Sequence, residues 1–233
     1  MGFDASMIGA GPEILLEPWL GNSSHIESGT THRRVVSEVH VDGDHYFALL
    51  MLDLVEHHRR RLAGVGHAST RLLHVLWGFP ARIKFPKTAC DSYERETLTE
   101  EGAGWIDVAG DSFARLYQPI GRIDMVAVVD KSVRRAVSRA ASHPATTRRL
   151  AIWSGQRHQT CQNSSEDLAE AARLGIGVIA LGKSEASALI EPAPAVTGRP
   201  AVYRWWQAEV CYRNWLSSTG PTGTTVNVGS PPW

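Results

Sequence analysis

The second half of the chain alternates short apolar runs with amphipathic segments, and this alternation constrains the fold more than any other feature. Residues 122–129 read RIDMVAVV, and residues 150–153 and 176–181 form two further apolar runs. Between these runs, residues 132–141 and 165–174 have the periodicity and end signals of helices. Strands that alternate with helices are typical of α/β domains with parallel pairing. We therefore predict an α/β fold with a mixed central sheet flanked by helices.

The first part of the chain predicts a helical N-terminal region over residues 35–80. An apolar run begins near Asp44 and ends in the basic stretch 57–61, which suits the negative end of a helix dipole. Glycines at 64 and 66 then stop this helix, and residues 68–77 predict a second one. Short strands are predicted at residues 81–85, 93–99 and 105–108.

The predicted α/β core spans residues 81–216 and closes with a helix over residues 201–216. Residues 1–34 and 217–233 are rich in Gly, Pro, Ser and Thr, and we predict a flexible arm and a flexible tail there. The chain has neither a run of about 18 apolar residues nor a secretion signal at its start. Three scattered cysteines argue against a disulfide framework. We expect a soluble, cytoplasmic protein without membrane association.

Charge is distributed unevenly along the chain. Basic and acidic residues balance at 24 each, yet residues 131–165 contain no acid. The cations of this basic segment are Lys131, Arg134, Arg135, Arg139, Arg148, Arg149 and Arg157. A concentrated positive patch attracts phosphates, and arginine is suited to contacting them with two hydrogen bonds. The segment therefore predicts a nucleic-acid partner, DNA in the first instance. The alternative is a solvated helix whose cations pair with acids elsewhere, such as Glu94, Glu96, Glu100 and Glu101.

Asp124 is the most informative single residue, because it lies inside an apolar strand. A buried carboxylate costs several kcal/mol unless it is paired or binds a metal. Two interpretations follow: Asp124 forms an ion pair with Arg122 or caps a neighbouring element, or Asp124 is a metal ligand at a strand edge.

The order of elements around Asp124 resembles the PD-(D/E)XK, or restriction-endonuclease-like, superfamily. The resemblance rests on GRIDMVAV at residues 121–128, LAIWSGQ at 150–156, the helix at 165–174 and GIGVIAL at 175–181, and it covers roughly residues 68–181. Members of this family carry an acid in one strand and Glu-x-Lys in the next, followed by a helix and a further strand. The two acids hold Mg²⁺ and the lysine orients the attacking water.

The second motif of this family is altered in the chain. Ser154 stands at the glutamate position and Gln156 at the lysine position, while Asp124 matches the first acid. Some family members take an acid from the following helix, where Glu166 and Glu170 lie. The resemblance thus implies either a Mg²⁺-dependent phosphodiester hydrolase or a catalytically inactive subunit. In the second case the chain would bind DNA or join a protein assembly of a defence or mobile-element system.

Two imidazoles and two carboxylates lie close together at His40, Asp42, Asp44 and His45. This donor set is chemically adequate for a transition metal. Its spacing matches no metal signature, and either aspartate suits the N-cap of the predicted helix. We favour the cap, with a metallohydrolase site as the alternative.

The closing helix is rich in aromatic residues, which are Tyr203, Trp205, Trp206, Tyr212 and Trp215. Their spacing places most of them on one face, which predicts a role in the core. Docking of a protein partner is the alternative. Arg204 and Arg213 lie on the other face and could stack on bases or touch phosphate.

Overall fold

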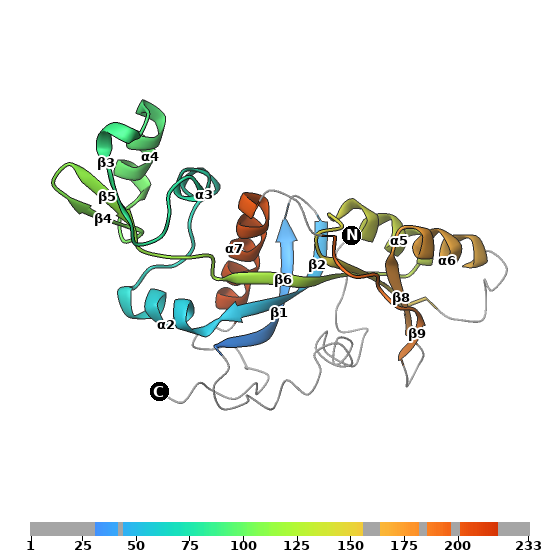
Figure 1. Ribbon diagram of the computed structural model, residues 1–233. Helices are drawn as coiled ribbons and strands as arrows, with labels where there is room; N and C mark the ends of the chain where they lie inside the picture. The colour runs from blue at the N-terminus through green and yellow to red at the C-terminus, as the bar shows by residue number, and fades with distance from the viewer. Residues whose placement is uncertain (1–30, 42–43, 156–163, 182–185, 197–200, 219–233) are drawn as a thin grey trace.

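The computed structural model describes residues 31–41, 44–155, 164–181, 186–196 and 201–218. Its centre is a six-stranded sheet with the strand order β1-β2-β6-β7-β8-β9 (Figure 1). The strands are β1 (His32–Val41), β2 (Asp44–Asp53), β6 (Gly121–Asp130), β7 (Arg148–Trp153), β8 (Ile176–Leu181) and β9 (Ala186–Ile190). Strands β6, β7 and β8 are parallel, and all other neighbours are antiparallel. The predicted α/β fold with a mixed sheet is confirmed.

Helices α5 (Val133–Ser142), α6 (Ser164–Arg173) and α7 (Ala201–Ser218) lie on one face of this sheet (Figure 1). Helices α5 and α6 are the crossovers that connect the three parallel strands, and their small apolar residues pack into one large core. All three helices, together with β6, β7 and β8, begin and end within two residues of the predicted bounds. The opposite face carries buried side chains that come from strands only, among them Phe47, Leu49, Met125, Leu150 and Ile179.

The helix predicted from Asp44 is wrong, because residues 44–53 form β2, in the interior of the sheet. Strand β2 lies between β1 and β6, and its side chains are buried on both faces: Ala48, Leu50 and Leu52 belong to the core under the helices, and Phe47 and Leu49 to the core on the opposite face. An almost continuous apolar run fits a strand buried on both faces as well as it fits a helix. Hydrophobic periodicity therefore could not distinguish a strand from a helix over these residues. The predicted helical region 35–80 is helical only from Leu54 onward, in α2 (Leu54–Ala63) and α3 (Thr70–Trp77).

Residues 70–115, which we call the inserted unit, lie between α2 and β6 and have a core of their own. After α3 come β3 (Lys84–Pro86), the one-turn helix η2 (Lys87–Ala89), α4 (Ser92–Glu101), β4 (Ile106–Ala109) and β5 (Ser112–Arg115). The three short strands form an antiparallel sheet in the order β3-β5-β4. Apolar residues of α3, α4 and this sheet pack around Trp205 of α7. The unit therefore extends from the core as a second compact body (Figure 1).

The strand predicted at residues 93–99 is also wrong, because these residues belong to α4. Asp91 accepts a hydrogen bond from the backbone N–H of Glu94, and the Glu94 carboxylate accepts one from the Asp91 N–H. This reciprocal capping box nucleates the helix. Tyr93, Thr97 and Thr99 favour strands in isolation, and the capping box outweighs that preference. The strands predicted at 81–85 and 105–108 are confirmed as β3 and β4, displaced by up to three residues.

A buried ionic network joins α2, α7 and the chain that leaves the inserted unit. Arg60 is fully buried and donates to both carboxylate oxygens of Glu209, at 2.8 and 2.9 Å, and to Glu56 at 3.1 Å. It also donates to the carbonyl oxygen of Gln118, and its guanidinium lies 4.6 Å from the centre of the Trp105 ring. Burial raises the pKa of Glu56, and the charge of Arg60 opposes this only in part. We call Glu56, Arg60 and Glu209 the Arg60 network.

The predicted arm and tail lie outside the described residues, except for residues 32–34 in β1 and 217–218 in α7. Among the helices described, none is long and apolar enough to cross a bilayer.

Candidate nucleic-acid interface

Asp124 lies near the amino end of β6, where the pairing with β2 shifts by one residue. Leu49 pairs with Met125 and Leu50 pairs with Ile123, so Asp124 is the extra residue of a β-bulge. Its carboxylate accepts a hydrogen bond from Nε of Arg122 at 3.1 Å, and the Arg122 side chain is largely exposed. The observed partner of Asp124 is thus the one that the ion-pair interpretation predicted.

Ser154, the described residue of the altered second motif, lies at a distance from Asp124. Met125, the next residue, is opposite Arg148, which is the first residue of β7. Ser154 follows the last residue of β7, and its N–H donates to the carbonyl oxygen of Asp130. Because β6 and β7 are parallel and Asp124 is level with residue 147, Ser154 lies about seven residues of strand, or about 23 Å, from Asp124.

The acids of α6 add no second ligand next to Asp124. Helix α6 starts after the carboxyl end of β7, and Glu166 is exposed in its first turn. Glu170 is exposed as well and forms an ion pair with Arg173, at 2.6 Å. Gln156 lies outside the described residues. Among those described, no group of three potential metal ligands includes Asp124.

The basic segment is continuous in sequence but divided in space. Arg139 donates to Asp44 at 2.8 Å and to the carbonyl oxygen of His45, which ties α5 to the β1–β2 hairpin. Arg149 donates to the carbonyl oxygens of His143 and Leu174, and burial lowers its pKa. These two arginines therefore have structural partners.

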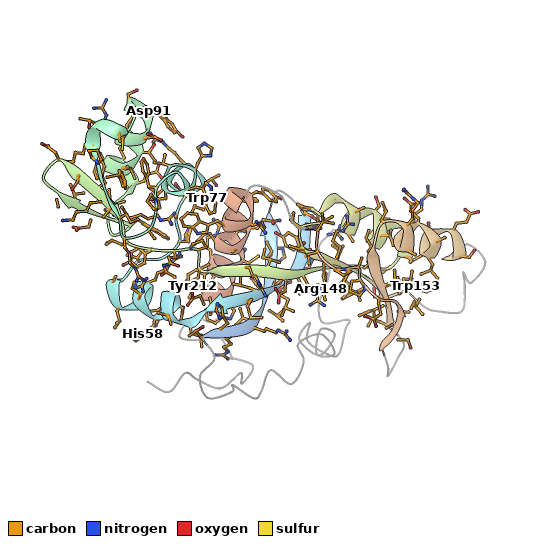
Figure 2. All side chains as sticks on the ribbon, in the orientation of Figure 1. His58, Trp77, Asp91, Arg148, Trp153 and Tyr212 are labelled. Atoms are coloured by element: carbon orange, nitrogen blue, oxygen red, sulfur yellow. The ribbon has the colours of Figure 1, made fainter. Side chains whose placement is uncertain are left out.

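The remaining cations of the segment lie at two ends of the sheet. Lys131, Arg134 and Arg135 are exposed at the start of α5, and Arg135 pairs with Asp130 at 3.2 Å. Arg148 is half-buried at the amino end of β7 (Figure 2), and Arg157 lies outside the described residues. The acids proposed as alternative partners, those of α4, are not the ones used: the described partners are Asp44 and Asp130. The six described cations of the segment therefore do not form one patch.

Helix α4 of the inserted unit presents a polar ridge to solvent. Ser92, Arg95, Glu96 and Thr99 are exposed, while Thr97 and Leu98 point into the core of the unit. On one flank of this ridge, Arg71 of α3 binds the acids of α4, at 2.8 Å from Glu100 and 3.4 Å from Glu101. These pairs partly neutralise the acids and direct them towards α3.

The other flank of α4 borders a pocket that two cations line. A pocket of about 410 Å³ opens between α4 and the β4–β5 hairpin, with Leu98, Ile106 and Phe113 among its apolar lining. Lys87 and Arg95 line the same pocket. Arg95 donates to the backbone oxygen of Asp91, and neither cation pairs with a described carboxylate. Figure 2 shows Asp91, at the start of α4, at the opposite end of the molecule from Trp153, with Arg148 between them and nearer the middle.

The sequence reading missed Lys87, Arg95 and Thr99, because it placed residues 93–99 in a strand. The available signal was Asp91 followed three residues later by Glu94, a pattern typical of a helix start. A second signal, for the β4–β5 hairpin, was Gly110–Asp111, which forms the two-residue turn between these strands.

The aromatic residues of α7 serve mainly the core. Trp205 and Tyr212 are buried, and Trp206 and Trp215 pack against the large core. Arg204 and Arg213 are exposed.

Comparisons with known proteins find no relative of this chain: no family model, no curated protein and no solved structure matches it.

Proposed function

We propose that this protein binds double-stranded DNA through the inserted unit, with α4 as the helix that enters the major groove. The observation that carries the proposal is the topology of the unit. Its elements run α3, β3, a one-turn helix, α4 and the β4–β5 hairpin, with the sheet order β3-β5-β4. This order of elements and strands resembles that of a winged helix-turn-helix, with the one-turn helix η2 in the place of the first helix of the pair and α4 in the place of the second. In helix-turn-helix proteins the second helix of the pair reads base edges.

The side chains on α4 support this assignment. Ser92 and Thr99 can hydrogen-bond to base edges or phosphates, and Arg95 can bind a phosphate with two hydrogen bonds. Lys84 and Lys87 precede α4, and Lys84 is exposed, so phosphate contacts are available beside the ridge. Three acids of α4, Glu96, Glu100 and Glu101, share the single cation Arg71 at 3.8, 2.8 and 3.4 Å, so their repulsion of phosphate is offset only in part.

The core of the protein supports binding more than hydrolysis. Asp124 has an arginine partner, and the serine that follows β7 lies at the far end of the strands. The family resemblance implied either a Mg²⁺-dependent hydrolase or an inactive DNA-binding subunit. We therefore propose the second, a cytoplasmic protein that binds DNA without cleaving it.

We expect that the protein retains duplex DNA with MgCl₂ present and does not cleave it, and that Asp124→Ala leaves the affinity for DNA unchanged.

A pair of charge reversals tests where DNA binds. We expect Lys87→Glu/Arg95→Glu to weaken binding of a labelled duplex at least about tenfold, because two phosphate contacts become repulsive. The measurement is fluorescence anisotropy at fixed low salt, with circular dichroism to confirm the fold.

The matched control is Arg134→Glu/Arg135→Glu, which makes the same charge change on the exposed start of α5. We expect it to change the affinity less than about threefold. The reverse pattern would assign binding to the basic segment and contradict a role for α4. An Mg²⁺-dependent loss of intact duplex would contradict the binding-only function.

A further inference from the structure

Two histidines and a glutamate come together at the turn end of the β1–β2 hairpin. His40 and His45 are directly opposite each other in the antiparallel register, and Glu38 lies two residues before His40 on β1. Residues two apart on a strand share a face, so all three side chains project from the same side of the sheet. The expected N-cap role for Asp44 is wrong, because α2 begins ten residues later and Asp53 caps it.

The three donor atoms converge on a small volume. Nε2 of His45 lies 2.7 Å from Oε1 of Glu38, and Nε2 of His40 lies 3.5 Å from the same oxygen. The potential ligand atoms of all three residues lie within 4.8 Å of one another. Ligand atoms around a tetrahedral Zn²⁺, at about 2.0–2.2 Å from the ion, are about 3.3 Å apart. The observed spacing is close to that value.

The histidine rings are oriented in the same way. They stack in parallel, with 4.3 Å between their centres and 6° between their planes, and both present Nε2 to Glu38. Because the two ring planes are nearly parallel, the Nε2 lone pairs lie in separate planes and do not converge on one point. Both nitrogens reach one ion only when the His40 ring turns out of the stack, which its exposure at the surface allows.

The surroundings hold one ligand in place and leave the site accessible. The backbone N–H of His45 donates to Asp44, and its carbonyl oxygen accepts from Arg139. Outer contacts of this kind orient metal ligands. The His40 side chain is 67% exposed, which leaves a path for an ion.

We propose that Glu38, His40 and His45 form a binding site for a divalent transition-metal ion, with Zn²⁺ as the fitting case. Imidazole and carboxylate donors suit Zn²⁺ and its neighbours, whereas Mg²⁺ prefers oxygen ligands alone. Three protein ligands leave a coordination position open, as in zinc sites that also bind water. This site is independent of the DNA-binding proposal.

Isothermal titration of the full, untagged chain with ZnCl₂ tests the proposal. We expect saturable binding of Zn²⁺, no binding of Mg²⁺, and at least about tenfold weaker Zn²⁺ affinity in each of His40→Ala and His45→Ala. Both residues lie at the exposed end of a hairpin, so the variants should fold, which circular dichroism checks.

The control is His74→Ala, which removes an exposed histidine from α3 and should leave the Zn²⁺ affinity unchanged. Absence of saturable binding would overturn the proposal. Binding that persists unchanged in both hairpin variants would overturn it equally, since the ion would then bind elsewhere. Neither result bears on DNA binding, which is measured without added metal.

Discussion

Replacing Arg60 by alanine is expected to destabilise the protein by about 3–5 kcal/mol, the range for removing one partner of a buried ion pair. Arg60 is fully buried, and its partners Glu56 and Glu209 are both 2% exposed. Without the guanidinium, two carboxylates remain buried: Glu209 loses its arginine partner, and Glu56 keeps only the partly exposed Arg59. Part of the cost would appear as a further rise in the pKa of Glu56, which burial already raises.

The measurement for Arg60→Ala is the free energy of unfolding in urea. Arg59→Ala is the matched control, because Arg59 pairs with the same Glu56 at 2.8 Å but is one-third exposed. Partly exposed pairs of this kind contribute less than about 1 kcal/mol. Should Arg60→Ala fail to fold, Arg60→Lys keeps one charge and should be intermediate. An Arg60→Ala variant within about 1 kcal/mol of the wild type would show that the network contributes little.

Replacing Trp205 by alanine is expected to cost a similar amount, about 3–5 kcal/mol, as for other buried aromatic residues. Trp205 is 1% exposed and belongs to the core of the inserted unit, although it comes from α7. Its indole N–H donates to Glu209 at 2.9 Å, and the guanidinium of Arg115 lies 5.1 Å from its ring. The substitution therefore leaves a cavity at the contact between the inserted unit and helix α7.

Trp77→Ala provides the comparison, since Trp77 meets the Trp205 ring edge to face at 5.8 Å but is 41% exposed. It should cost less than about half as much, because less apolar area leaves the interior. Urea unfolding of both variants, together with limited proteolysis of the inserted unit, measures the difference. Equal destabilisation by the two substitutions would contradict the role of Trp205 as the contact that holds the unit.

Local sequence signals were sufficient for the parallel half of the sheet. Strand β6, helix α5 and strand β8 each combine a clear period with a recognisable end, and the structure places them where they were predicted. The prediction for the residues of strand β2 was wrong for a physical reason. A strand that is covered on both faces lacks the alternation of apolar and polar residues that distinguishes a strand from a helix. Its position between β1 and β6 depends on pairing between distant residues, which no local pattern encodes.

The candidate site was less predictable than the fold, because it depends on which basic and acidic side chains the fold brings into contact. Arg139 belongs to a stretch without acids, yet its partner Asp44 lies 95 residues away. Arg148 and Arg149 are adjacent in sequence, but alternation along β7 directs them to opposite faces. The sequence reading grouped these cations into one patch. It overlooked Lys87 and Arg95, which only the folding of α4 against the β4–β5 hairpin brings together.

The salt dependence of duplex DNA binding by the unmodified chain tests the central proposal most directly. With about three phosphate contacts, from Lys84, Lys87 and Arg95, the affinity should fall about 40-fold between 50 and 200 mM salt. Fluorescence anisotropy of a labelled duplex, without added metal, gives both values. Binding that weakens in this way supports a DNA-binding protein. No binding at 50 mM salt, or binding that salt does not change, would contradict the proposal.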